Sequence, residues 1–253
     1  MTEPVTHRVM TSDGVEIALD YYQTFSSPAV IVICPGFFQH RRTPRFRQIA
    51  SCVADRGYDV VVFDFRGHGQ SGGLYTFGQQ ETQDLRTVLD FVRPRYPKLG
   101  VLAFSLGASI AIHTLADTHQ SDGLIAVAPV ANLDTITPLS VWWPGAFRSW
   151  WSQRTVRRSF RGLTLHYGKP HALDVVDQVS PTPILFIHGT KDWLVNVQQS
   201  QCLYTKAREP KQLHLIPGGR HAEELFERDP DGFLAVCCRW FQEVFEAKNP
   251  RSS

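Results

Sequence analysis

The sequence predicts an α/β fold, with a mostly parallel central sheet flanked by helices. Apolar runs of strand length alternate with amphipathic helical segments along most of the 253 residues, and this order is typical of parallel strands joined by helices. Several runs are apolar at every position, as expected of strands covered on both faces. One stretch, about residues 132–178, breaks the alternation. We therefore expect a single domain over residues 1–253 with a small inserted cap.

The first predicted elements are a β-hairpin and a buried strand. Residues 7–10 and 15–22 flank a Ser-Asp-Gly turn at 12–14, a pattern typical of a tight hairpin. Residues 29–34 form a continuous apolar run that ends at a Pro-Gly pair. That run predicts a strand buried on both faces, followed directly by a turn.

The alternation of helices and strands then begins. Thr43 is placed to cap a helix with Pro44 at its first position, and Gly57 supplies its stop. Residues 59–63 predict the next strand, and residues 80–92 predict a helix with one apolar face.

The remaining elements lie before and after the irregular stretch. Before it we expect a strand, a helix and a strand, at residues 100–104, 106–115 and 124–128. After it we expect a strand, a helix, a strand and a last helix, at residues 184–188, 197–207, 212–216 and 232–247. This order implies strands that run mainly parallel.

Charge and composition restrict the classes of partner and compartment. The net charge of +2 and the pI near 8.3 are too mild to indicate a nucleic-acid partner. The amino-terminal residues contain no apolar stretch typical of a signal peptide, and no run is long enough to span a membrane. The five cysteines are scattered without C-x-x-C spacing. We therefore expect a cytoplasmic protein without a disulfide framework or a zinc site.

The clearest chemical signal is the pentapeptide Ala-Phe-Ser-Leu-Gly at residues 103–107. It lies between a predicted buried strand and a predicted apolar helix. A nucleophile at the apex of such a turn needs small residues two positions before and after it, and it benefits from the positive end of the helix dipole. A serine that merely caps the helix would fit the pentapeptide alone. The strand–turn–helix context favours Ser105 as a nucleophile.

A nucleophilic serine needs a histidine base and a carboxylate that orients it. His221 follows the last predicted strand in a Gly-rich loop, whereas His188 ends a strand and His113 lies within a helix. Asp192 follows the strand at 184–188 across a turn, and Asp134 is the alternative acid. We predict Asp192 and His221, because they complete the chain order Ser…acid…His.

With these residues the sequence resembles the α/β-hydrolases, above all the branch of serine aminopeptidases and monoacylglycerol lipases. The resemblance covers nearly the whole chain and includes Asp-Phe-Arg-Gly-His-Gly-Gln-Ser-Gly at 64–72, similar to the family's D-x-R-G-x-G-x-S stretch. That stretch looks structural in relatives, so we do not count His68 as catalytic. The chain departs from the family at Ala103, in place of the first motif glycine, and at Cys34-Pro35-Gly36, in place of His-Gly.

The resemblance implies an α/β-hydrolase fold and a serine hydrolase that cleaves carboxylic esters through an acyl-enzyme. It implies an oxyanion hole built from the backbone N–H groups of Phe37 and Leu106. The implied chemistry uses a small-molecule ester as substrate and needs no metal or cofactor. A small peptidase or an acyltransferase could use the same three residues, and a catalytically silent binding protein is the alternative that is not an enzyme.

The cap region has an unusual composition. Between residues 141 and 169 it contains six basic residues and no Asp or Glu. Its aromatic side chains would line an acyl pocket, rest the cap weakly on an anionic membrane surface, or pack only on the main domain. The candidate pocket residues are Trp142, Trp143, Phe147, Trp150 and Trp151.

Overall fold

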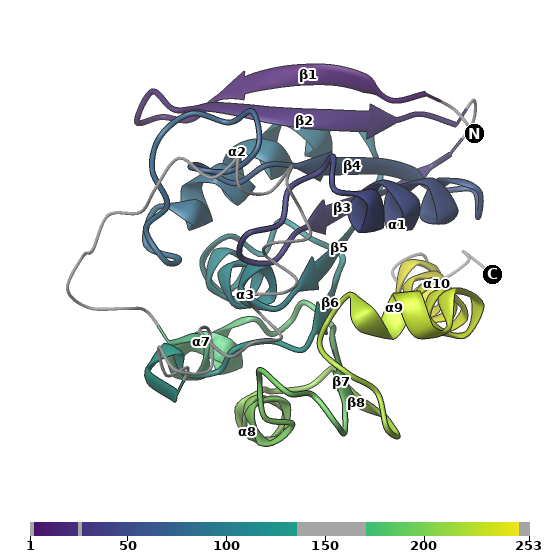
Figure 1. Ribbon diagram of the computed structural model, residues 1–253. Helices are drawn as coiled ribbons and strands as arrows, with labels where there is room; N and C mark the ends of the chain where they lie inside the picture. Colours follow the sequence, from purple (N-terminus) through teal and green to yellow (C-terminus); the bar gives the residue numbers. More distant parts are fainter. Residues whose placement is uncertain (1–2, 25–26, 136–170, 248–253) are drawn as a thin grey trace.

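An eight-stranded sheet forms the centre of the protein, with the strand order β1-β2-β4-β3-β5-β6-β7-β8 (Figure 1). The computed structural model describes residues 3–24, 27–135 and 171–247. The strands are β1 (Val5–Met10), β2 (Glu16–Tyr22), β3 (Ala29–Cys34), β4 (Asp59–Phe63), β5 (Lys98–Phe104), β6 (Gly123–Val127), β7 (Ile184–Gly189) and β8 (Lys211–Ile216).

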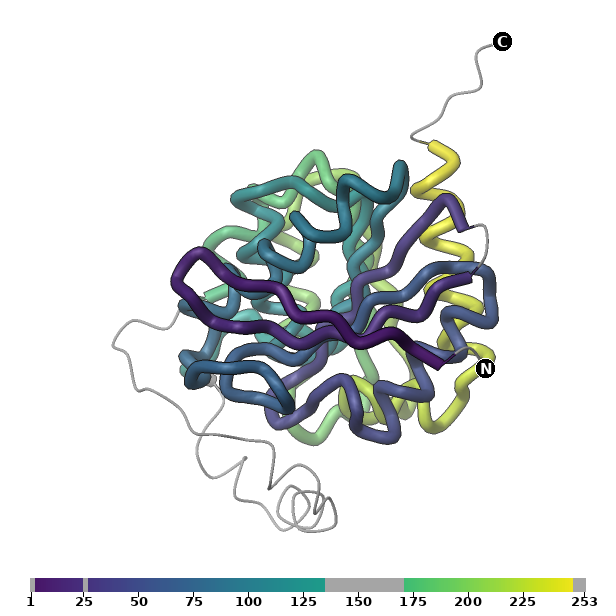
Figure 2. The backbone as a smooth tube through the Cα atoms, turned by 90° about the horizontal axis from the view of Figure 1, so that it is seen from above, coloured from purple at the N-terminus to yellow at the C-terminus, as the bar shows by residue number. Residues whose placement is uncertain are grey.

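Only one edge of the sheet is antiparallel. Strand β2 pairs antiparallel with β1 and with β4, and the strands from β4 to β8 are parallel to one another. Figure 2 looks onto this edge, where the β1–β2 hairpin lies in front of the other strands. The loops after β3, β5, β7 and β8 therefore leave the sheet at the same edge, where α/β folds place their sites.

Helices cover both faces of the sheet, which confirms the predicted fold class (Figure 1). One face carries α2 (Glu81–Val92), α3 (Leu106–Thr118), α7 (Ala172–Val175) and α8 (Gln198–Lys206). The other face carries α1 (Pro44–Ala54), α9 (Glu224–Arg228) and α10 (Pro230–Ala247).

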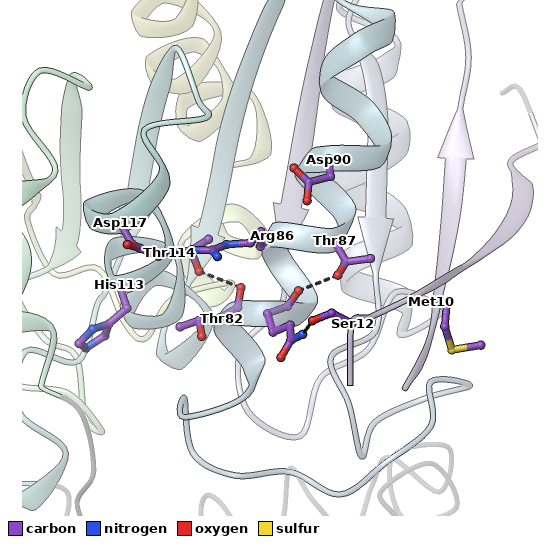
Figure 3. A pocket seen from close by; sticks show the side chains of 10 residues that line it. Met10, Ser12, Thr82, Arg86, Thr87, Asp90, His113, Thr114 and Asp117 are labelled. Atoms are coloured by element: carbon purple, nitrogen blue, oxygen red, sulfur yellow. Dashed lines mark hydrogen bonds and ion pairs between the residues drawn. The ribbon is translucent and has the colours of Figure 1, made fainter. Parts of the chain in front are cut away.

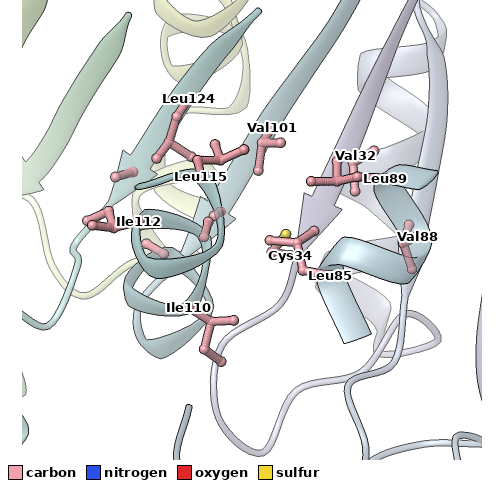
Figure 4. Packing of buried hydrophobic residues seen from close by; sticks show 14 of the residues in the cluster. Val32, Cys34, Leu85, Val88, Leu89, Val101, Ile110, Ile112, Leu115 and Leu124 are labelled. Atoms are coloured by element: carbon pink, nitrogen blue, oxygen red, sulfur yellow. The ribbon is translucent and has the colours of Figure 1, made fainter. Parts of the chain in front are cut away.

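Branched aliphatic side chains fill much of the space between the sheet and α2–α3, whereas aromatic side chains such as Phe104 and Phe241 are prominent on the opposite face. On the α2–α3 face, Val32, Val101 and Leu124 of the sheet meet helical side chains such as Leu89 and Leu115 (Figure 4). Each such side chain contributes about 1.5–3 kcal/mol on burial. All residues of β3 and β4 are buried, so the strands that lead to the site belong to a rigid frame.

The structure moves some of the predicted boundaries. The last helix begins at Pro230, two residues earlier than predicted, because proline suits the first turn of a helix. The short helix α9 was not predicted. The hairpin turn is looser than expected: Gly14 N–H donates to Thr11 O and Gly14 has φ 79°, as in a loop with a glycine bulge. No helix in the described residues is both long and apolar enough to cross a bilayer.

Only the two ends of the expected insertion, 132–178, belong to the described residues. Residues 133–135 form a 3₁₀ helix, and residues 172–178 form α7 and a second 3₁₀ helix. Ala172 and Val176 are buried in the same core cluster as α3. The five candidate pocket aromatics, between residues 142 and 151, lie outside the described residues.

Candidate active site

Ser105 occupies a strained turn between β5 and α3. Its backbone has φ 52° and ψ −123°, a conformation that costs a residue with a side chain about 1–3 kcal/mol. Two backbone hydrogen bonds hold the turn, because Ser105 N–H donates to Val127 O at 2.8 Å and Ser105 O accepts from Ala108 N–H at 3.0 Å. The neighbouring strand thus fixes the residue at the apex.

Small residues allow two backbone segments to approach this turn. A Cβ atom at position 107 would clash with the carbonyl oxygen of Pro35, and one at Gly36 would lie 3.2 Å from Cβ of Ser105. Ala103 is completely buried. The loop after β3 therefore passes directly beside Ser105, which is the physical reason for Gly107 two positions after it.

The structure brings together the three side chains predicted to react. His221 Nε2 lies 3.0 Å from Ser105 Oγ, and His221 Nδ1 lies 2.7 Å from Asp192 Oδ2. Asp192 comes from the loop after β7 and His221 from the loop after β8. Both loops leave the same edge of the sheet as Ser105. The parallel topology therefore brings three residues that are distant in sequence into one hydrogen-bonded row, Ser105–His221–Asp192.

The electrostatics of this row favour a charged carboxylate. Asp192 Oδ1 accepts hydrogen bonds from the backbone N–H groups of Leu194 and Val195, both at 2.9 Å. Burial alone raises the pKa of Asp192, but the hydrogen bonds from His188 and His221 outweigh it and hold this pKa well below its usual range.

The contacts in this row also determine the pKa and the tautomer of His221. Burial lowers the pKa of His221, whereas the hydrogen bond to Asp192 raises it, and the net pKa lies above its ordinary value. A charged Asp192 requires Nδ1 of His221 to be the donor. In the neutral ring Nε2 is therefore the acceptor for the Ser105 hydroxyl proton.

His188, the competing histidine, supports the acid instead of contacting the serine. Its Nε2 lies 3.2 Å from Asp192 Oδ2 and 3.0 Å from Val195 O, and its Nδ1 lies 2.6 Å from Ser200 Oγ. Both neighbours of Nε2 are acceptors, so Nε2 carries the proton and Nδ1 accepts from the Ser200 hydroxyl. The fully buried His188 side chain thus contacts the same Asp192 oxygen, Oδ2, as His221 does.

The other sequence candidates lie elsewhere. Asp134 has 68% of its side chain exposed, and Oδ2 lies 3.4 Å from His171 Nε2. His113 lines a polar hollow between α2, α3 and the β1–β2 turn, together with residues such as Arg86 and Asp117 (Figure 3). None of the three residues of the Ser–His–Asp row lines this hollow.

The two predicted oxyanion donors each adjoin a residue of the turn around Ser105. Leu106 is the first residue of α3, where backbone N–H groups have no acceptor within the helix. Phe37 follows Gly36, where an added Cβ would lie 3.2 Å from Cβ of Ser105. The ring of Phe37 packs against Phe38, Tyr75 and Phe77, with ring centroids 3.9, 5.0 and 5.2 Å away.

Two residues next to His221 were missed from the sequence. Trp193 is 39% exposed, its ring lies 6.2 Å from the His221 ring, and its Nε1 donates to Glu224 Oε1 at 3.4 Å. Trp193 directly follows Asp192, and this adjacency was the available signal. Across the residues that the structure describes, no group of three or more His, Cys, Asp and Glu side chains could hold a metal ion.

The fold and the Ser–His–Asp row are those of an α/β serine hydrolase. The chain matches the family model described as serine aminopeptidase, S33, over residues 26–174 and 162–229. It therefore belongs to this family, which confirms the resemblance deduced from its motifs.

Individual proteins are similar to this chain over most of its length. The chain is 30% identical to the uncharacterized protein YqkD of Bacillus subtilis over 218 residues, which cover 83% of this chain and 70% of YqkD. It is 26% identical to a monoacylglycerol lipase of Mycolicibacterium smegmatis over 244 residues, covering 82% and 86% of the two chains. An esterase structure from Pyrococcus furiosus superposes with a TM-score of 0.79 at 22% identity and covers 96% of this chain and 91% of its own.

Proposed function

We propose that the protein is a serine esterase that hydrolyses small-molecule carboxylic esters through an acyl-enzyme. The observation that carries the proposal is the continuous row from Ser105 Oγ through the His221 ring to Asp192, with contacts of 3.0 and 2.7 Å. The lipase and the esterase among the similar proteins agree with this chemistry.

In the proposed mechanism His221 Nε2 takes the proton of Ser105 as Oγ attacks the ester carbonyl carbon. Asp192 keeps the His221 ring in the required tautomer and stabilises the imidazolium. His221 then returns the proton to the leaving alcohol. In the second half, His221 activates water, and the water cleaves the Ser105 ester to release the acid.

The negative charge of the tetrahedral intermediate would be stabilised by the backbone N–H groups of Phe37 and Leu106. Losing one donor of this kind typically costs about 2.7–4 kcal/mol of barrier. The partly buried rings of Phe37 and Phe77 provide apolar surface next to the proposed oxyanion donor, and the buried Tyr75 ring packs against both. We therefore favour substrates with an apolar acyl group.

A fluorophosphonate probe tests the proposed nucleophile. The wild-type chain should be labelled at Ser105, and Ser105→Ala should abolish labelling while it leaves the melting temperature nearly unchanged. A panel of p-nitrophenyl esters of increasing chain length then tests the reaction, with Ser105→Ala losing several orders of magnitude in kcat. Labelling or turnover that persists in purified Ser105→Ala would refute the assignment.

A second candidate is an aminopeptidase, and Glu224 is the observation that favours it. An aminopeptidase needs an acidic group that binds the protonated amino terminus of its substrate. Glu224 accepts from Trp193 beside His221, and its negative charge contributes to the raised pKa of His221. Aminoacyl nitroanilides, assayed beside the esters, separate the two candidates. Faster turnover of the nitroanilides, lost in Glu224→Gln, would favour the peptidase.

A further inference from the structure

The loop after β3 is attached to a histidine that takes no part in the Ser–His–Asp row. The backbone N–H of Phe38 donates to His68 Nε2 at 3.2 Å. His68 Nδ1 lies 3.1 Å from the carbonyl oxygen of Arg66. His68 is 3% exposed and belongs to the stretch at 64–72 that resembles a family motif.

These two contacts define the tautomer of His68. A carbonyl oxygen only accepts, so Nδ1 must carry the proton, and Nε2 presents its lone pair to the Phe38 N–H. Burial lowers the pKa of His68 to about 4, which keeps the ring neutral near pH 7. A protonated ring would place a second N–H opposite that of Phe38.

The attached segment is strained. Gln39 N–H donates to Gly36 O at 3.1 Å, which closes a β-turn with Phe37 and Phe38 at its centre. Phe38 has φ 60°, at the position where such turns normally require glycine. A phenylalanine keeps this backbone conformation only if its surroundings fix it. The hydrogen bond to His68 fixes the peptide plane between Phe37 and Phe38.

The turn at residues 64–72, which carries His68, is itself held by several hydrogen bonds. The Asp64 carboxylate accepts from the N–H groups of Arg41 at 2.7 Å and of Gln70 at 2.8 Å, and it also pairs with the Arg41 guanidinium. Ser71 Oγ donates to Asp64 O at 2.6 Å. A side chain at Gly69 would clash with this carboxylate. The turn at 64–72 is thus fastened to both ends of the segment 38–41.

We propose that His68 is a positioning residue, which holds the turn at 36–39 so that the Phe37 N–H can act as an oxyanion donor. This role rests on the proposed esterase function. It also assigns a purpose to the 64–72 stretch, which carries the oxyanion loop and contributes no atom to the Ser–His–Asp row.

Two variants separate the acceptor from the rest of the ring. In His68→Gln the amide oxygen can occupy the place of Nε2 and accept from Phe38. In His68→Asn the amide reaches only the place of Nδ1, so it can bond to Arg66 O but leaves the Phe38 N–H without its acceptor. We expect kcat on a p-nitrophenyl ester to fall about 10- to 100-fold in His68→Asn, less than for complete loss of an oxyanion donor.

Three readouts distinguish positioning from a merely structural role. KM should change less than about 3-fold in both variants, and His68→Gln should recover most of the lost kcat. The affinity for a trifluoromethyl ketone, whose adduct carries an oxyanion, should fall in His68→Asn by the same factor as kcat/KM. Equal activity of wild type and His68→Asn, or equal losses in both variants, would overturn the inference.

The failure of this inference is distinguishable from failure of the proposed function. A wild-type chain without labelling and without ester turnover overturns the function and, with it, the role of His68. An active wild type allows a separate test by 15N NMR of the full chain at pH 7. His68, assigned by its loss in His68→Asn, should show a protonated Nδ1 and an unprotonated Nε2. The opposite tautomer or a charged ring would overturn the inference.

Discussion

The proposed site has two sides: the ionisable side chains of His221 and Asp192 form the first, and the proposed oxyanion donors, the backbone N–H groups of Phe37 and Leu106, form the second. The first side depends on which residues follow β7 and β8. For Phe37, the second depends on the path of the backbone after β3, and buried side chains distant in sequence hold that path. The first side is therefore determined by which residues occupy a few positions, and the second by the conformation of the backbone.

The largest expected effect comes from replacing the acid of the first side, and it distinguishes Asp192 from the alternative acid, Asp134. Asp192→Asn should lower kcat about 10⁴-fold with the fold intact, because an amide stabilises the wrong tautomer and no longer stabilises the imidazolium. Asp134→Asn is the matched control and should retain wild-type kcat, since Asp134 contacts His171 instead of His221. Kinetics on one p-nitrophenyl ester decide the point, and a larger loss in Asp134→Asn would show that the acid was misassigned.

On the second side, we expect the largest effect of a substitution to be a loss in the free energy of unfolding. Arg41 is completely buried, with Nε 3.0 Å from Asp20 Oδ1 and its guanidinium paired with Asp64. Arg41→Met removes the buried guanidinium from both carboxylates. Among the described residues, Asp20 then keeps only the Thr6 hydroxyl and the exposed Arg42, and Asp64 keeps only backbone N–H donors. This loss should cost about 3–5 kcal/mol in the free energy of unfolding.

The neighbouring arginine provides the control for that measurement. Arg42 has 47% of its side chain exposed and lies 3.6 Å from Asp20, so Arg42→Met should cost less than about 1 kcal/mol. Urea denaturation of both variants measures the difference. Equal midpoints would mean that the buried pair does not anchor the oxyanion loop.

The sequence alone selected the three side chains that the structure brings together, because the evidence for each is local. Ser105 lies in a short motif, and Asp192 and His221 each follow a recognisable strand in the required order. The parallel sheet was predictable for a similar reason, since β3 and β4 are apolar at nearly every position. Residue identity and periodicity suffice for such features.

The supports of the second side could not be predicted in the same way. A positive φ at Phe38 is not encoded by phenylalanine, which normally avoids this region. The contact between Phe38 and His68 joins residues 30 positions apart, and no local sequence pattern predicts it. His188 likewise looked structural, and only the folded arrangement shows that it contacts Asp192.

A smaller change tests how closely the two sides must approach. In Gly36→Ala the new Cβ would lie 3.2 Å from Cβ of Ser105, so the loop must shift by a few tenths of an ångström. We expect kcat to fall about 10-fold, because small displacements of reacting groups are costly. Gly72→Ala is the control, since its Cβ would meet nothing closer than 3.6 Å. Similar kcat values for both variants would show that the loop adapts freely.

The smallest expected effect is on the pH dependence of the reaction, because the base of the first side, His221, is a titrating group. The Ser105 proton is taken by neutral His221, so kcat/KM should be lost as pH falls through the raised pKa of His221. His68 remains neutral in this range because its pKa is about 4.

Glu224→Gln removes a negative charge that stabilises the imidazolium, which lowers the pKa of His221 and moves the acid limb of the profile to lower pH. Glu243→Gln, an exposed site on α10, should leave the limb in place. A limb that stays unchanged in Glu224→Gln would assign it to a group other than His221.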